Sequence, residues 1–208
     1  MKKIVRWLSF SVLLVVLLLC LQTRAFPQVR VGGEAGINIA TLSVSLNDFY
    51  WDDSRVSSYV GPAFGGIVQA DLTSLLFLRI EPMYVQKGTK LRIDYSVFAG
   101  PPLSTTQPLK LEFLELPVTL GIQFGEGALR PHLFAGPNIG YMLTRGYSRI
   151  DFALDAGLGG EYALSSACSI LLDVRYSAGL NNLNSEDPGA PELRSRGIQP
   201  MVGLLFRP

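Results

Sequence analysis

Hydrophobic and polar residues alternate one by one along most of this chain, and that period of two constrains the fold more than any other feature. Successive side chains of a β-strand point to opposite faces, so each such stretch has one apolar and one polar face. Gly and Pro residues separate the stretches and interrupt any helical periodicity. The pattern predicts eight strands, at Val29–Leu42, Ser57–Asp71, Leu75–Lys87, Leu109–Phe124, Leu129–Leu143, Ile150–Leu164, Cys168–Gly179 and Gly197–Arg207. We therefore expect an all-β fold.

Eight strands of this kind fit two architectures, which differ in where the apolar face points. In a soluble sandwich or ligand-binding barrel the apolar face points inward. In an outer-membrane barrel the apolar face meets lipid and the polar face lines the interior. Strand length favours the membrane barrel, because several strands exceed ten residues. Strands of soluble sheets usually have about five or six residues, whereas a tilted membrane strand needs about 9–11.

Long and short connections alternate along the chain. The tight connections are 72–74, 125–128 and 165–167, and the mostly longer ones are 43–56, 88–108, 144–149 and 180–196. Short periplasmic turns and longer external loops are typical of outer-membrane barrels. With an even number of strands, both termini are expected on the periplasmic side.

Aromatic residues on the apolar parity gather near the strand ends. We expect Tyr84, Tyr141 and Tyr176 near the external ends, and Phe124, Tyr162 and Phe206 near the periplasmic ends. Two such rings match the aromatic girdles that membrane barrels place at the bilayer interfaces. The sequence thus predicts an eight-stranded antiparallel up-and-down transmembrane β-barrel surrounded by outer-membrane lipid. A soluble or periplasmic small-ligand-binding β-barrel, which would have an apolar interior, is the alternative.

The first 25 residues have the features of a secretory signal peptide. Lys2, Lys3 and Arg6 precede an apolar run from Leu8 to Leu21, and the small residues Thr23 and Ala25 stand at positions −3 and −1 of the expected cleavage site. The run is too short for a membrane-spanning helix, which needs about 20 residues. We predict a cleaved signal peptide over residues 1–25 and an outer-membrane barrel domain over residues 26–208.

Charge excludes a nucleic-acid binder, because 18 basic and 17 acidic residues give a formal charge of only +1. Removal of residues 1–25 would take four basic residues and no acidic one, and would lower the charge to about −3. It would also remove Cys20, so that Cys168 has no partner for an intramolecular disulfide.

Four short segments carry a likeness to a known family: Val31–Leu42, Leu114–Pro117, Phe134–Pro137 and Asp155–Glu161. Through them the chain resembles the outer-membrane β-barrel family that includes the PorT-like proteins of Bacteroidetes. The resemblance implies an eight-stranded barrel, placed in the outer membrane by the insertion machinery. That machinery often reads a terminal aromatic residue, whereas here Phe206 is followed by two further residues.

Eight charged residues share the inward parity: Glu34, Arg79, Glu81, Glu115, Asp155, Glu161, Asp173 and Arg175. An eight-stranded barrel is only wide enough for side chains to fill, so a diffusion pore is not expected. Unpaired buried charges are costly, and we therefore expect Arg79 and Arg175 to bridge acids. A structural ionic network is the main interpretation, and a proton or ion path is the alternative.

No residue pattern indicates catalysis, a metal site or a cofactor. His132 is the single histidine and follows a predicted periplasmic turn, the wrong end for the outer-membrane hydrolases that act near the external rim. One histidine and one cysteine cannot form the usual zinc site. An outer-membrane hydrolase is therefore the less favoured alternative.

Exposed aromatic residues in the first long loop suggest a contact surface. Phe49, Tyr50 and Trp51 lie among three aspartates there, a mixture that suits protein contacts. We predict a non-enzymatic outer-membrane protein, structural or adhesive or accessory to a secretion or transport assembly, whose external loops meet a surface partner.

Overall fold

Every regular element of the described chain is a β-strand. The computed structural model describes residues 28–45, 56–95, 103–125, 127–144, 149–183 and 192–207. The strands are β1 (Gln28–Ser45), β2 (Val56–Asp71), β3 (Leu76–Ile80), β4 (Met83–Tyr95), β5 (Leu103–Gln123), β6 (Leu129–Met142), β7 (Ile150–Ala163), β8 (Cys168–Gly179) and β9 (Glu192–Phe206). The predicted signal peptide and the residues Phe49, Tyr50 and Trp51 lie outside the described residues.

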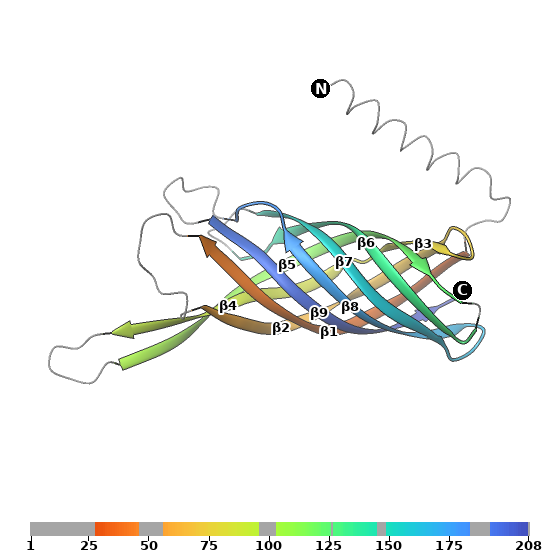
Figure 1. Ribbon diagram of the computed structural model, residues 1–208, viewed down its shortest axis with the longest axis horizontal. Helices are drawn as coiled ribbons and strands as arrows, with labels where there is room; N and C mark the ends of the chain where they lie inside the picture. Colours follow the sequence, from red (N-terminus) through yellow and green to blue (C-terminus); the bar gives the residue numbers. More distant parts are fainter. Residues whose placement is uncertain are drawn as a thin grey trace, which may run out of the picture.

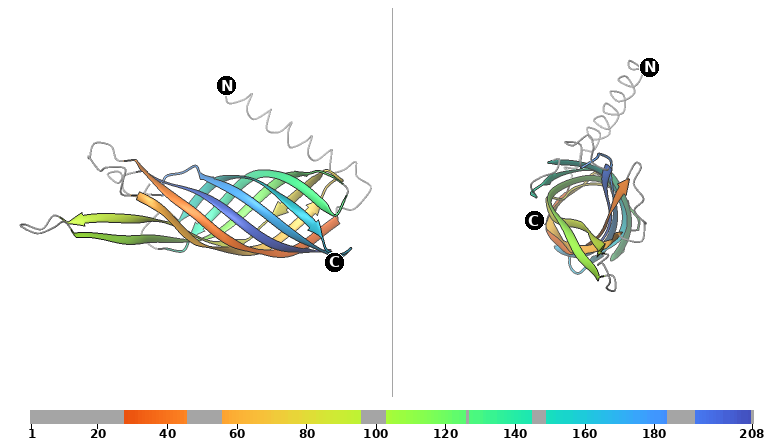
Figure 2. Two further views of the ribbon diagram at one scale, coloured as in Figure 1. Left: turned by 60° about the horizontal axis from the view of Figure 1, so that its bottom comes forward. Right: turned by 90° about the vertical axis from the view of Figure 1, so that its left-hand side faces the viewer.

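The strands close into one antiparallel barrel (Figures 1 and 2). Each strand pairs with its neighbour in sequence from β4 to β9, and β1 pairs with both β2 and β9, which closes the ring. β3 and β4 follow one another along β5 and take one place in the ring. The prediction of an eight-stranded up-and-down barrel is therefore confirmed.

Pro82 divides the strand that we predicted as one piece from Leu75 to Lys87. The pairing with β5 has the same register on both sides of the break, from Ile80 opposite Val118 to Met83 opposite Glu115. Gly66 of β2 donates its N–H to the Pro82 carbonyl oxygen at 3.0 Å. Pro82 has no N–H that could donate a hydrogen bond back to Gly66, so the ladder of hydrogen bonds with β2 is interrupted at this point.

The prediction that residues 88–108 form a loop was largely wrong, because most of this segment is strand. β4 and β5 stay paired from Met83–Glu115 to Tyr95–Leu103 and extend beyond the ring as a hairpin (Figure 1). Proline is tolerated here because β5 pairs with β6 only from Phe113 onward, so this part of β5 is a sheet edge. Likewise, part of the predicted loop 180–196 is strand, since β9 begins at Glu192 and pairs there with the end of β1.

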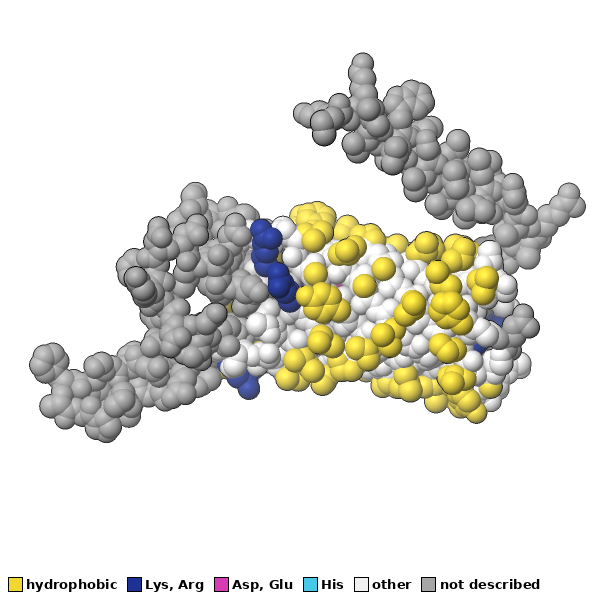
Figure 3. Space-filling model, viewed as in Figure 1, with side chains coloured by type: hydrophobic (Ala, Val, Ile, Leu, Met, Phe, Trp, Pro, Cys, Tyr) yellow, Lys and Arg dark blue, Asp and Glu magenta, His cyan; other side chains and the backbone are white. Residues whose placement is uncertain are grey.

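Apolar side chains face outward and polar ones face inward. Leu158 and Leu172 are each 60% exposed, whereas Arg175 and Gln199 are fully buried. Hydrophobic side chains cover much of the visible barrel wall (Figure 3). A soluble barrel needs an apolar interior, and that alternative is therefore wrong. No helix among the described residues is long and apolar enough to cross a membrane.

The two ends of the barrel differ. At one end, the turn end, the links between β2 and β3, β5 and β6, and β7 and β8 are tight. At the other, the loop end, lie the ends of β1 and β8 and the start of β9. In the tight link between β5 and β6, Gly125 has a φ of 84°, a backbone conformation that glycine adopts without strain.

Interior glycines give the large side chains room. A Cβ at Gly157 would overlap the Phe134 ring. A Cβ at Gly159 would overlap Asp173 Oδ1 and lie 2.8 Å from His132 Nε2. The close-packed interior therefore depends on the absence of side chains at these β7 positions.

Candidate functional site: the charged barrel interior

The eight charged residues expected inside the barrel all lie there, and each is at most 6% exposed. They are Glu34, Arg79, Glu81, Glu115, Asp155, Glu161, Asp173 and Arg175. Strands β1 to β8 or their immediate ends supply them and the partners described below, because alternate residues of each strand point into the shared interior. Their polar contacts form three groups along the barrel.

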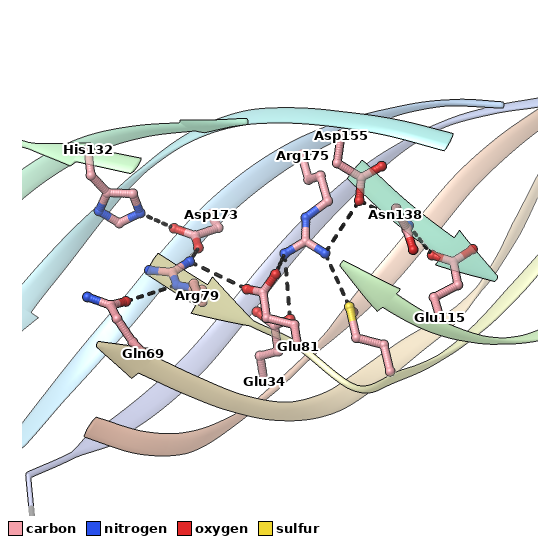
Figure 4. Close-up of polar contacts among 11 residues, drawn as sticks. Glu34, Gln69, Arg79, Glu81, Glu115, His132, Asn138, Asp155, Asp173 and Arg175 are labelled. Carbon is pink, nitrogen blue, oxygen red and sulfur yellow. Dashed lines mark hydrogen bonds and ion pairs between the residues drawn. The ribbon is translucent and has the colours of Figure 1, made fainter. Parts of the chain in front are cut away.

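In the central cluster, Arg79 bonds to groups from two other strands (Figure 4). Its Nη1 donates to Asp173 Oδ2 at 2.6 Å, and its Nε donates to Gln69 Oε1 at 2.9 Å. His132 Nε2 lies 2.8 Å from Asp173 Oδ1. The Arg79 guanidinium also lies 5.0 Å from the centre of the Phe77 ring, which adds a cation–π contact.

Arg175 holds the other half of the central cluster. Its Nη2 donates to Glu81 Oε2 at 2.5 Å and lies 3.8 Å from Glu34 Oε1. Its Nη1 lies 4.0 Å from Asp155 Oδ2 and donates to Met83 Sδ at 3.2 Å. One guanidinium thus faces three carboxylates from β1, β7 and the β3–β4 break (Figure 4). Both expected arginine bridges are present.

A second group, the turn-end cluster, surrounds Arg30. Arg30 pairs with Asp71 at 2.8 Å and with Glu161 at 2.5 Å. Arg130 also pairs with Glu161 at 2.5 Å. Gln69 Nε2 donates to Asp71 Oδ1 at 2.9 Å. Gln69 Oε1 also accepts a hydrogen bond from Arg79. Gln69 therefore joins the turn-end cluster to the central cluster.

A third group, the loop-end cluster, surrounds Lys87. Its Nζ lies 2.7 Å from Glu115 Oε1 and 3.0 Å from Asp151 Oδ2. Asn138 Nδ2 donates to Glu115 Oε2 at 2.9 Å and to Asp155 Oδ2 at 3.0 Å. Asn138 therefore connects this cluster to the central one, and polar contacts run without a break from Arg130 to Asp151.

Acidic groups outnumber basic ones in this interior. Among the described residues, seven buried carboxylates accompany four buried Lys or Arg side chains. One oxygen of each of Glu34, Glu81, Asp151 and Asp155 has no hydrogen-bond partner. The surplus carboxylates can hold protons or bind cations, while the paired ones fix the positions of the strands.

One set of carboxylates has the spacing of a metal site. Oxygens of Glu34, Glu81 and Asp173 lie within 4.8 Å of one another. Arg79 and Arg175 already contact members of this set. Because these guanidinium groups supply positive charge there, the donor set does not call for a metal ion.

Several interior residues were missed by the sequence reasoning. Arg30, Lys87 and Asp151 are buried and bear charges; strand parity places them on the polar faces of their strands, but the expected charge network did not include them. His132 was placed at the turn end but not assigned to the interior, where it is 3% exposed. Asn138 carries no charge, so a search for charged residues passed over it.

The six aromatic residues assigned to girdles lie on the outer face. Five of them are exposed, and the sixth is half-buried. Tyr141, Tyr176, Phe124, Tyr162 and Phe206 are 45–50% exposed. Tyr84 is half-buried, with its ring centre 5.2 Å from that of Phe64. Their contact with the bilayer interfaces stays a prediction.

Comparison with known proteins gives one family. The family model described as outer membrane protein beta-barrel domain matches residues 22–185. Neisserial surface protein A is similar in structure, with 15% identity and a TM-score of 0.53 over 88% of this chain and 99% of that chain. OprG from Pseudomonas aeruginosa has 13% identity and a TM-score of 0.51 over 88% of this chain and 97% of that chain. No curated protein was found to match the sequence.

Proposed function

Because this chain belongs to the outer membrane protein beta-barrel domain family, we propose that it acts in the outer membrane as a non-enzymatic structural protein. Its barrel would hold the external loops in place, and the loops would contact an adhesion partner or a secretion or transport assembly. The outer-membrane location follows from the family and the fold. The role of the loops is the proposal.

The filled interior is the observation that carries this function. Polar contacts join Arg130 at the turn end to Asp151 at the loop end. Aromatic side chains occupy the space between the charges, with Phe113 4.8 Å from Lys87 Nζ and Phe134 5.6 Å from the Arg175 guanidinium. A solute would have to displace these groups in order to pass, so function is expected at the surface of the barrel.

An enzymatic role for His132 is disfavoured by the same packing. His132 is 3% exposed and lies against Asp173, Phe77 and Phe134. A general base must come within hydrogen-bond reach of its substrate. No such approach is open without disruption of the interior, which argues against the outer-membrane hydrolase.

We further propose that the turn end is periplasmic and the loop end is external, as in other barrels with short and long connections. The predicted signal peptide would export the chain, and the insertion machinery would place it in the membrane. The segment with Phe49, Tyr50 and Trp51 would then be external. Membership of the PorT-like group stays a proposal that rests on the sequence motifs.

Cell fractionation and gel migration test the barrel, and loop substitution tests the contact role. The protein should appear in the outer-membrane fraction and migrate differently after heating. Joint substitution of Phe49→Ala, Tyr50→Ala and Trp51→Ala should leave gel migration unchanged. Proteins that crosslink to the parent protein on the surface of intact cells should no longer crosslink to this variant. Leu180→Ala, at an exposed loop-end position, is the control.

Two results would contradict the proposal. The contact role fails if the triple variant retains every crosslinked protein of the parent. The closed barrel fails if the purified protein forms steady channels in a planar bilayer.

A further inference from the structure

A pocket lies in the mouth of the barrel at the turn end, where the C-terminus also lies (Figure 1). Its volume is about 230 Å³, whereas a water molecule in the liquid occupies about 30 Å³, so a small solute fits. The link between β7 and β8 and the turn-end parts of β1, β6, β7, β8 and β9 form its walls. The charged and hydroxyl-bearing side chains of the lining are Arg30, Arg130, Ser165, Ser166, Ser169 and Arg207. We call this site the arginine pocket.

The arginines of the pocket belong to the inward face of the barrel and not to the lipid-facing wall. Arg30 is on the inward face of β1 and is 2% exposed. Arg130 lies two residues before His132 on β6 and shares its inward parity. Arg207 lies two residues after Leu205 and continues the inward parity of β9. A ligand would therefore reach these groups through the aqueous mouth of the barrel.

Two of the arginines keep an N–H group without a hydrogen-bond partner. Arg30 donates from Nη1 to Glu161 and from Nη2 to Asp71. Arg130 donates from Nη2 to Glu161. The Nε atoms of both arginines are buried and have no hydrogen-bond partner in the described chain. A buried donor without an acceptor is unfavourable, so these groups favour a ligand that accepts hydrogen bonds.

The third arginine lies close to Arg30 across the seam between β1 and β9. Val31 pairs with Phe206, and Arg30 and Arg207 are the next residues of the chain toward the turn end. Two residues opposite each other on neighbouring strands are on the same face, where like charges repel. An anion bound between these two guanidinium groups would be attracted by both.

We propose that the arginine pocket binds the phosphate group of a soluble molecule. Guanidinium groups offer planar pairs of N–H donors to phosphate oxygens. Here they come from three parts of the barrel and can reach different oxygens of a tetrahedral anion, whereas a carboxylate has two oxygens in one plane. Ser165 Oγ accepts from the N–H groups of Ala167 and Cys168, so its hydroxyl hydrogen remains available to donate. With the turn end periplasmic, as proposed above, the ligand is a periplasmic solute.

Binding is tested by isothermal titration calorimetry on the purified, folded full-length protein in a nonionic detergent at low salt. Inorganic phosphate is the probe, and it should bind at one site per barrel. Acetate should bind more weakly, because it has a single charge and two oxygens. Phosphatidic acid mixed into the detergent micelles should not displace inorganic phosphate, because its headgroup stays beside the lipid-facing wall.

Two pairs of variants locate the site. Arg207→Gln should weaken phosphate binding about 10–100-fold, the usual contribution of a hydrogen bond to a charged group. Arg196→Gln makes the same change at an exposed position near the loop end of β9 and should leave binding unchanged. Ser166→Asp adds a negative charge at an exposed position of the lining and should abolish binding, whereas Ser166→Asn adds none and should retain it. Gel migration before and after heating establishes that each variant is folded.

The proposal is overturned if inorganic phosphate gives no saturable heat of binding. It is also overturned if Arg196→Gln weakens binding as much as Arg207→Gln, or if Ser166→Asp and Ser166→Asn bind phosphate equally well. Full displacement by phosphatidic acid would assign the site to a lipid headgroup and reject a soluble ligand. Equal affinity for acetate would reject a phosphate group as the preferred ligand.

Discussion

Replacement of Arg175 by methionine should strongly destabilise the barrel. The side chain is fully buried, pairs with Glu81 at 2.5 Å, and lies 3.8 Å from Glu34 and 4.0 Å from Asp155. Methionine keeps much of the volume but leaves three carboxylates without their shared cation. Removal of one partner of a buried pair costs about 3–5 kcal/mol. We expect Arg175→Met to lower the free energy of unfolding by this amount.

Urea titration of the protein folded into phosphatidylcholine vesicles measures the loss, with heat-modifiable migration as the signal for the folded barrel. Arg207→Gln, at an exposed site, should change the stability by less than about 0.5 kcal/mol. Combination of Arg175→Met with Glu81→Gln should recover part of the loss, because the closest carboxylate is then neutral. Recovery is incomplete, since Glu34 and Asp155 remain charged.

A loss below about 1 kcal/mol for Arg175→Met would refute this reasoning. So would strictly additive effects of the two substitutions. Either result would mean that water solvates these charges in the barrel and that the ion pairs do not hold it together.

Three other substitutions test the packing, the lipid-facing wall and the strand break. Gly159→Ala places a Cβ against Asp173 and should cost about 1–3 kcal/mol in the same titration, whereas Gly127→Ala meets nothing within 4 Å; equal effects would contradict the packing argument. Leu172→Arg, at a 60% exposed position, should cost about 2–4 kcal/mol if it lies near the bilayer midplane, and Leu172→Ile should cost little; a tolerated arginine would count against lipid contact. Pro82→Ala supplies the missing N–H opposite Gly66, so hydrogen exchange should detect a slowly exchanging amide at position 82; rapid exchange there would show that proline is not the cause of the break.

Strand parity predicted much of the fold, because a residue's face depends only on its place along the strand. It assigned Glu34, Asp155 and Arg175 to the interior without knowledge of their partners. It could not predict that Arg175 faces Glu81, because that pairing depends on the stagger of strands far apart in the sequence. The hairpin of β4 and β5 was missed because proline in this segment is typical of a loop. The pairing of the two strands becomes evident only when their residues are compared across the hairpin.

The interior ion pairs also constrain how the barrel can form. Arg30 pairs with Glu161 across 131 positions of the chain, and Arg79 pairs with Asp173 across 94. Lys87 and Glu115 pair within one hairpin, but the carboxylates of Glu161 and Asp173 reach Arg30 and Arg79 from strands outside the hairpins of those arginines. An open sheet in the membrane would present these charges to hydrocarbon, at a cost of several kcal/mol each. The order of assembly is thus restricted, because β1 and β9 must come together before, or as, the strands cross the bilayer. The ion pairs form when the ring closes, so they stabilise a late and cooperative closure step.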